Sequence, residues 1–352
     1  MKNLYLVLIV FLSNLSTTTA QLVNVATGLS LPRLIEIKDN QLYVAQGGNG
    51  IISKIDITDT TYTLVDIISG LNNPIGIKIL GDEMYVTELY ANRIFKVNLT
   101  DPNLTQIDIL TNIPPPTAIE IIGNNLYFTI VSTSNDKLMK VDLTDTNKVV
   151  TEVLTGLQDP VDIIAVGNEL YISEFLGNKI VKFDVVNSNF GEVDVVTGGL
   201  NGPSALHFSG NDLYIANYYS NEIVKVNIGQ PLPITSTANV ESVTSPYGLT
   251  FDGNDMYVSD FNNKVVTFNI FPVSTNELKT QKEWIISPNP VQNFIQLKGL
   301  KTHQQYTIID AVGRALQSGS IHPNEQVSIK NLAKGMYFIR LENGTTQEFL
   351  KQ

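Results

Sequence analysis

A pair formed by a hydrophobic residue and a tyrosine recurs six times along this chain, at intervals of 42 to 44 residues. A proline stands eleven residues before each tyrosine. A period of this length, repeated without a gap, is typical of folds in which one small unit is stacked many times. The six prolines and tyrosines are Pro32 and Tyr43, Pro74 and Tyr85, Pro116 and Tyr127, Pro160 and Tyr171, Pro203 and Tyr214, and Pro246 and Tyr257.

Each repeat has the pattern of four short strands. In the second repeat an apolar run follows Pro74, a Gly81-Asp82 turn leads into the tyrosine strand, and two further alternating segments cover 93–97 and 106–110. Four strands in 42 to 44 residues is the period of a β-propeller blade. Because one blade cannot bury both of its faces alone, the six repeats are expected to stack around an axis. The fold class predicted is therefore all-β, with a six-bladed β-propeller over residues 21–273.

The sixth repeat lacks its fourth strand, since the chain leaves the pattern after Phe271. A segment with the missing pattern lies at the other end, where residues 22–28 precede Pro32 as residues 192–198 precede Pro203. The N-terminal strand is therefore predicted to complete blade six and close the ring. Such closure removes the free sheet edges that invite aggregation.

Charge and composition narrow the possible partners. Residues 21–274 carry 13 basic and 28 acidic side chains, whereas residues 284–352 carry 7 basic and 4 acidic ones. An acidic main body argues against nucleic acid as a partner, because phosphate binding needs a lysine- and arginine-rich surface. The chain has no cysteine, which excludes disulfides, thiolate metal sites and a cysteine nucleophile.

The two ends differ from the repeats. Residues 1–20 combine Lys2, a short apolar run and small residues before Gln21, the pattern of a cleaved signal peptide. That run is too short for a transmembrane anchor. Residues 274–283 are polar and are predicted to be a linker. Residues 284–352 show short alternating strands, which suit a small Ig-like β-sandwich.

The repeats resemble NHL-type propeller repeats, as in Asn73-Pro74-Ile75-Gly76-Ile77 followed by Met84-Tyr85-Val86-Thr87-Glu88. These are related to the senescence-marker and gluconolactonase-like superfamily. The resemblance covers residues 22–271 and implies a fold. It does not imply one function, because such propellers serve both as binding scaffolds and as enzymes.

The C-terminal segment resembles the sorting domain of the type IX secretion system of Bacteroidetes. The matching features, in order, are Ser287-Pro288-Asn289-Pro290, an Asp310-x-x-Gly313-Arg314 turn, Leu332-x-x-Gly335-Met336-Tyr337 and Lys351 near the end. The resemblance implies export through the periplasm to the outer surface or the medium, with the type IX machinery as a partner. An ordinary adhesive sandwich is the alternative.

One set of candidate site residues lies three positions after each tyrosine, with aromatic residues just beyond. Carboxylates and amides beside aromatic rings could bind a glycan, a peptide or a cation. The alternative is that each polar residue only binds the backbone of a loop between blades. The set comprises Gln46, Glu88, Glu174, Asn217 and Asp260, with Tyr90, Phe175, Tyr218, Tyr219 and Phe261.

A second set lies four positions after each proline. Its neighbours in the strand are uniformly apolar, so alternation turns this set toward the central channel. The channel could be a charge-balanced solvent path or could carry a proton through its histidine. Its members are Glu36, Lys78, Glu120, His207 and Thr250.

The residue types at the candidate catalytic positions favour binding over catalysis. Gluconolactonase-type propellers hold a divalent cation with ligands that include residues directly after the blade proline. Here those positions hold no carboxylate or amide, and a single propeller histidine disfavours a lyase or a Ser-His-Asp arrangement. The positions are Arg33, Ile75, Thr117, Val161, Ser204 and Tyr247.

Three functional hypotheses therefore follow from the sequence. The first is an exported, non-catalytic binding propeller for a glycan, peptide or protein. The second is a metal-dependent hydrolase or lyase that uses Glu88, Glu174, Asn217 and Asp260, with a cation such as calcium. The third is a structural component of the cell surface without a discrete ligand.

Overall fold

The computed structural model describes residues 22–133, 135–187, 191–270, 284–287, 291–310, 314–323, 325–341 and 346–351. The proposed signal peptide and linker lie outside these residues. The described chain is built from strands, and it divides into two compact units at residues 272 and 273. It contains no helix long and apolar enough to cross a membrane.

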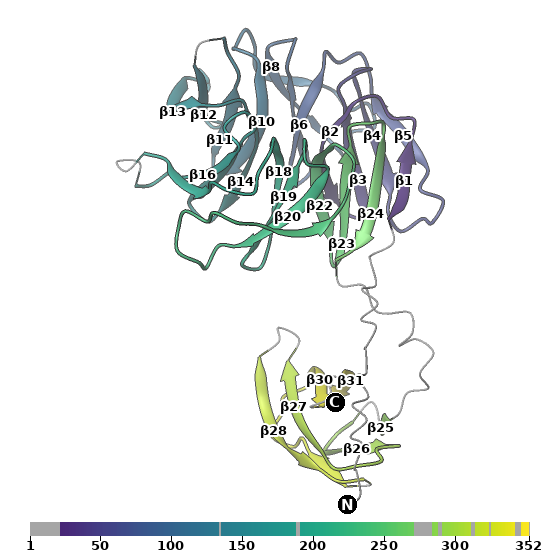
Figure 1. Cartoon of the computed structure of the whole chain (residues 1–352). Helices are drawn as coiled ribbons and strands as arrows, with labels where there is room; N and C mark the ends of the chain where they lie inside the picture. The colour runs from purple at the N-terminus through teal and green to yellow at the C-terminus, as the bar shows by residue number, and fades with distance from the viewer. Residues whose placement is uncertain are drawn as a thin grey trace, which may run out of the picture. The chain divides into compact units, whose positions relative to one another are not determined.

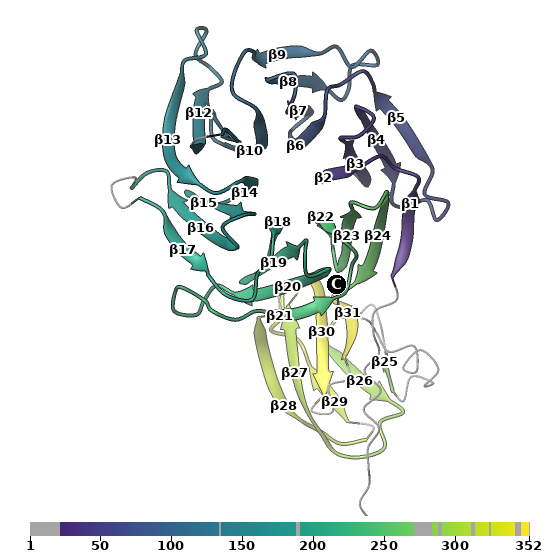
Figure 2. The same ribbon diagram turned by 45° about the horizontal axis from the view of Figure 1, so that its top comes forward.

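Six antiparallel sheets of four strands form the first unit (Figure 1). The first strands lie nearest the axis, and each contacts the first strands of the two adjacent sheets, so they form a closed ring (Figure 2). These strands are β2 (Pro32–Lys38), β6 (Pro74–Leu80), β10 (Pro116–Ile122), β14 (Pro160–Val166), β18 (Pro203–Ser209) and β22 (Pro246–Asp252).

The second and third strands pair outward from them in chain order. The second strands are β3 (Gln41–Gln46), β7 (Glu83–Glu88), β11 (Asn125–Ile130), β15 (Glu169–Glu174), β19 (Asp212–Asn217) and β23 (Asp255–Asp260). The third strands are β4 (Ile51–Asp56), β8 (Arg93–Asn98), β12 (Asp136–Asp142), β16 (Lys179–Asp184), β20 (Glu222–Asn227) and β24 (Lys264–Asn269).

The outermost strands confirm the predicted closure. Five of them follow their own blade, whereas the sixth sheet takes its outer strand from the N-terminus, where β1 pairs antiparallel with β24. The outer strands are β5 (Leu64–Ile68), β9 (Ile107–Leu110), β13 (Val150–Leu157), β17 (Val193–Val196), β21 (Ala238–Glu241) and β1 (Val23–Thr27).

The core lies between neighbouring sheets, as the repeat predicts. All six repeat tyrosines are buried, and so are the apolar residues three positions after each proline. One cluster shows the principle, because it joins Leu42 and Val44 to Val25, Tyr257 and Val265 of the adjoining sheet.

Buried hydroxyls join neighbouring blades. The Thr87 hydroxyl accepts a hydrogen bond from Gly76 N at 2.8 Å and donates to the carbonyl of Thr117 in the next blade at 2.6 Å. Ser259 makes the equivalent link from the last blade, donating to the carbonyl of Arg33 at 2.7 Å. These bonds satisfy backbone groups that burial between blades would otherwise leave unpaired.

The second unit has two sheets around one core. Trp284, Ile295, Ile308, Ile339 and Phe349 all belong to that core, so the sheets pack face to face as a sandwich. One sheet has the order β25 (Ile285–Ser287), β26 (Phe294–Lys298), β29 (Gln326–Ser328). The other has the order β28 (Ala315–Ile321), β27 (Gln304–Asp310), β30 (Gly335–Leu341), β31 (Thr346–Lys351).

Candidate functional site

Two cavities follow one another along the propeller axis. The first, here the mouth pocket, has a volume of about 250 Å³ and includes residues that directly follow the blade prolines. The second, here the channel cavity, has a volume of about 350 Å³ and is lined by residues two to five positions after the prolines. The mouth pocket is lined by Arg33, Ile75, Leu89, Thr117, Val131, Asp159, Val161, Phe175, Tyr218, Tyr219, Tyr247 and Phe261.

The mouth pocket holds a guanidinium group against two rings. The Cζ of Arg33 lies 4.9 Å from the ring centroid of Tyr247 and 4.8 Å from that of Phe261. These two rings stack on each other with centroids 5.6 Å apart. Burial raises the pKa of Tyr247, while the positive charge of Arg33 opposes that shift. The rings therefore hold Arg33 in place by cation–π attraction.

Three more rings extend this aromatic wall. The centroid of Phe175 lies 5.6 Å from that of Tyr218 and 5.1 Å from that of Tyr219. Gly202 makes this packing possible, because a Cβ there would come within 2.6 Å of Cδ2 of Tyr219, and its φ of +68° favours glycine. The opposite wall is aliphatic and includes Ile75 and Val131.

Four of the predicted aromatic residues thus reach the mouth pocket: Phe175, Tyr218, Tyr219 and Phe261. Tyr90 does not, because its side chain is 66% exposed and the neighbouring Leu89 takes the place in the pocket.

The predicted polar set lies elsewhere, inside the blades. Glu88, for example, is 1% exposed, accepts a hydrogen bond from Asn72 N at 2.6 Å and pairs with Arg93. The other members are equally buried, one in each of four further blades. They are Gln46, which accepts from Ser30 N; Asn217, which accepts from Asn201 N; Asp260, which accepts from Asn262 N; and Glu174, which lies 3.7 Å from Lys179.

This placement differs from the expectation of a polar ring around the mouth. The side chains are turned into their own blades, where they pair with loop N–H groups and with neighbouring cations. Without these side chains, burial would leave those groups without partners. Burial also raises the pKa of Glu174 to about 7, although Lys179 opposes the shift. The five side chains do not converge on a shared space.

A divalent cation of the gluconolactonase type does not fit the mouth. The residues directly after the prolines offer Arg33, Ile75, Thr117, Val161 and Tyr247 to the pocket, and Asp159 is its one carboxylate. Within the described ranges, no three histidine, aspartate or glutamate side chains are grouped to hold a metal ion.

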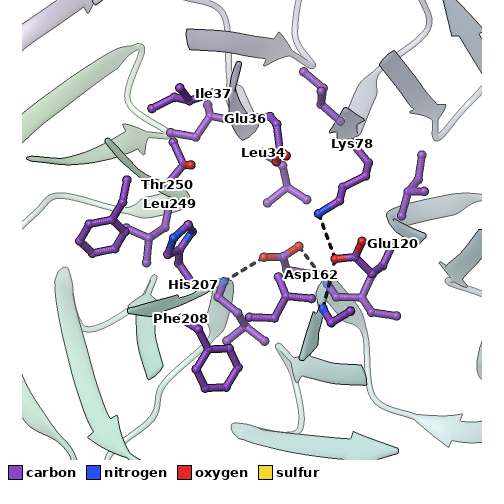
Figure 3. Close-up of a pocket in the computed structure, with 18 residues that line it drawn as sticks. Leu34, Glu36, Ile37, Lys78, Glu120, Asp162, His207, Phe208, Leu249 and Thr250 are labelled. Carbon is purple, nitrogen blue, oxygen red and sulfur yellow. Dashed lines mark hydrogen bonds and ion pairs between the residues drawn. The ribbon is translucent and has the colours of Figure 1, made fainter. Parts of the chain in front are cut away.

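All five members of the second predicted set line the channel cavity (Figure 3). Lys78 Nζ lies 3.0 Å from Oε2 of Glu120, which also accepts a hydrogen bond from Ala165 N at 3.1 Å. Burial would lower the pKa of Lys78, but the charges of Glu36 and Glu120 outweigh it and raise that pKa. Burial lowers the pKa of His207 to about 4.

One residue of the channel cavity was missed by the sequence argument. Asp162 accepts hydrogen bonds from the backbone N–H groups of Ile163 at 2.8 Å and Leu206 at 2.9 Å, and burial raises its pKa to about 7. It stands two positions after a proline, where four of the other repeats have glycine or alanine. Comparing that column across the repeats would have singled out Asp162, together with Leu34.

Replacing Glu36 with glutamine should make the propeller more stable than the native chain at neutral pH. At acid pH the two chains should be about equally stable. Burial raises the pKa of Glu36 to about 7, from a usual value near 4.5. The unfolded chain therefore loses this proton first, and native stability falls as pH rises from about 4.5 to 7. The gain in free energy of unfolding from Glu36→Gln should be close to zero at pH 4 and on the order of 3 kcal/mol above pH 7.

Urea unfolding of both chains between pH 4 and pH 8 measures this difference. The contribution of His207 to the free energy of unfolding also changes with pH, because its pKa is lowered in the folded chain. This contribution is present in both chains, so it cancels in the difference between them. Glu241→Gln, on the outer strand β21, is the control and should give a flat difference. A Glu36→Gln difference that does not change with pH would contradict the prediction.

Comparison with known proteins identifies the second unit. Residues 285–352 match the family described as Secretion system C-terminal sorting domain. A domain of this kind directs export by the type IX secretion system to the cell surface or the extracellular space. A comparison with curated protein sequences finds no match.

Solved structures similar to this chain are propeller proteins. They include virginiamycin B lyase from Staphylococcus aureus (18% identity, 71% of this chain, 99% of that chain, TM-score 0.52). A protein described as a putative gluconolactonase has 8% identity over 72% of this chain and 92% of its own, with a TM-score of 0.58. An auxiliary nutrient binding protein from Bacteroides thetaiotaomicron has 14% identity over 69% of each chain and a TM-score of 0.56.

These identities establish the fold alone. Together with the match of the C-terminal segment, they show that the chain is an exported β-propeller protein carrying a secretion-system sorting domain.

Proposed function

We propose that this protein is a non-catalytic binding protein, which the sorting domain delivers to the outside of the cell and which holds a small ligand in the mouth pocket. The observation that carries the proposal is the pocket itself. It joins one guanidinium, one carboxylate and two apolar walls on the propeller axis. Concave sites with mostly apolar walls and a few polar groups are the usual form of small-ligand sites.

The chemistry of the lining favours binding over turnover. The mouth pocket contains no histidine, its hydroxyls belong to Thr117 and three tyrosines, and Asp159 is its one carboxylate. It therefore lacks the hydroxyl–histidine pair of an activated nucleophile. The enzymes among the similar structures include a lyase, a protein described as a putative gluconolactonase and a luciferin-regenerating enzyme. The set of residues that a metal-dependent hydrolase would need, Glu88, Glu174, Asn217 and Asp260, is divided among separate blades and buried there.

The binding function predicts that filling the mouth pocket removes ligand binding. Leu89 lines the pocket and Tyr90, the next residue, does not, so Leu89→Trp and Tyr90→Trp form a matched pair. We expect at least one member of a fragment set of saccharides, carboxylates, amines and short peptides to bind the native chain. Leu89→Trp should weaken that binding at least tenfold, because the indole occupies the pocket, whereas Tyr90→Trp should leave it unchanged.

Ligand-observed NMR with the purified chain measures the binding, and thermal unfolding verifies that both variants are folded. Equal binding by the native chain and Leu89→Trp would place the ligand elsewhere and refute the proposal. Hydrolysis of lactones or esters at enzymatic rates would refute the non-catalytic part of it.

A further inference from the structure

Arg33 differs from the other propeller arginine in lacking an acidic partner. Arg93 is held by Glu88, Asp108 and Gln106. Arg33 takes part in none of the ion pairs among the described residues, and its buried Nε makes no hydrogen bond there. The Cζ of its guanidinium lies over the rings of Tyr247 and Phe261. A guanidinium has five N–H donors in its plane, and two of them in parallel suit a carboxylate.

Asp159 brings the opposite charge to the same pocket from the far side of the ring. It precedes the proline of blade four, and Arg33 follows the proline of blade one, so the two stand three blades apart in a ring of six. Its backbone N–H is bound by Asp136 at 2.7 Å, while its carboxylate joins no ion pair among the described residues. Burial and the charge of Asp136 raise the pKa of Asp159, so a cation beside this carboxylate would favour its ionised form.

The space between these two groups is small and apolar. Its volume of about 250 Å³ lies below the range of roughly 300 to 1,000 Å³ typical of sites for drug-sized ligands. Aromatic rings line the side of Arg33, and Ile75, Leu89, Val131 and Val161 line much of the remainder. A ligand that fits must carry little polar surface between its ends, because these walls offer few hydrogen-bond partners.

We propose that the mouth pocket binds a free dipeptide with an apolar or aromatic side chain, its carboxylate on Arg33 and its ammonium on Asp159. This inference rests on the proposed binding function and specifies its ligand. A lone carboxylate leaves Asp159 unpaired, and a lone amine leaves Arg33 unpaired, so only a zwitterion satisfies both. A single amino acid carries both charges on one carbon, whereas a dipeptide separates them by about 7 Å, at 3.3–3.6 Å per residue.

The probe for this inference is glycyl-L-phenylalanine, measured by calorimetry against the purified full chain. Its N-acetyl derivative and its C-terminal amide each lack one charge, and both should bind at least tenfold more weakly. Free phenylalanine should also bind at least tenfold more weakly.

Two variants assign each charge of the dipeptide to its partner. Arg33→Gln should remove the difference in affinity between the dipeptide and its amide but keep the loss of affinity on N-acetylation. Asp159→Asn should do the reverse. Lys54→Gln and Asp252→Asn, which lie outside the pocket, should change neither difference.

Several results would overturn the inference. They are no binding of the dipeptide, equal binding of the dipeptide and its two neutralised forms, or equal binding of free phenylalanine. These comparisons need only the native chain, so they hold even if a variant fails to fold. One of these results could occur while another fragment still bound the native chain and bound Leu89→Trp more weakly. The dipeptide would then be excluded, and the proposed binding function would stand.

Discussion

A chain that begins at Gly28 instead of Gln21 should lose the cooperative unfolding transition of the propeller. It would lack β1, which covers the outer edge of β24 and buries Val25 and Ala26. Full burial of one valine side chain contributes about 1.5–3 kcal/mol, and the lost strand also leaves ladder hydrogen bonds unmade. The open ring would expose an apolar sheet edge. Because folded domains are stable by only about 5–15 kcal/mol, a loss of this size is a large part of the total.

Two matched substitutions separate loss of the strand from a general effect of changing it. Val25 is 3% exposed and Val23 is 42% exposed on the same strand. Val25→Asp should lower the melting temperature by more than 10 °C, whereas Val23→Asp should change it by only a few degrees. A peptide of residues 21–29, added to the shortened chain, should restore the transition by strand addition. A shortened chain that melts as the native chain does would show that the ring does not depend on β1.

Removing residues 284–352 should keep the protein in the periplasm of a bacterium that has a type IX secretion system. Those residues contain the sorting domain. The propeller has its own core clusters and the sandwich has another, so the shortened protein should fold and melt like the propeller of the full chain. We expect the extracellular and surface fraction to fall more than tenfold, measured by immunoblotting of cell fractions.

A substitution within the sandwich separates recognition of the folded domain from mere length. Ile308 is fully buried on β27, while Thr307 beside it is not. Ile308→Asp should reduce export as strongly as the deletion, because a charge in this core costs several kcal/mol, and Thr307→Asp should not. Export of the shortened chain at the native level would contradict the role of the domain in this protein.

The fold could be predicted in most of its parts because its signals are local and repeated. The proline and tyrosine of each repeat fix the positions of two strands, and the alternation between them fixes which side chains face a neighbouring blade. The closure by residues 22–28 followed from counting strands. The hydroxyl links between blades, such as that of Thr87 to Thr117, could not be read in this way, because they depend on backbone groups that approach only after the blades have packed.

The candidate site was predicted less completely, and the channel and the mouth show why. Glu36, Lys78, Glu120, His207 and Thr250 occupy one column of the repeat and line one cavity. For the mouth, the sequence offered two columns, and the polar one that begins with Gln46 was preferred. A polar side chain near a loop can face a ligand or satisfy the loop's own N–H groups, and spacing does not distinguish these outcomes.

The sequence by itself determined the number of repeats, their strand order, the strand that closes the ring and the sorting function of the tail, because each of these is written in spacing or in contiguous motifs. Only the tertiary structure decided which residues meet at the axis. Arg33 and Asp159 are 126 positions apart and share no motif, yet both line one pocket. Their meeting depends on how six blades close into a ring, since that closure brings one position from each distant repeat into a common space.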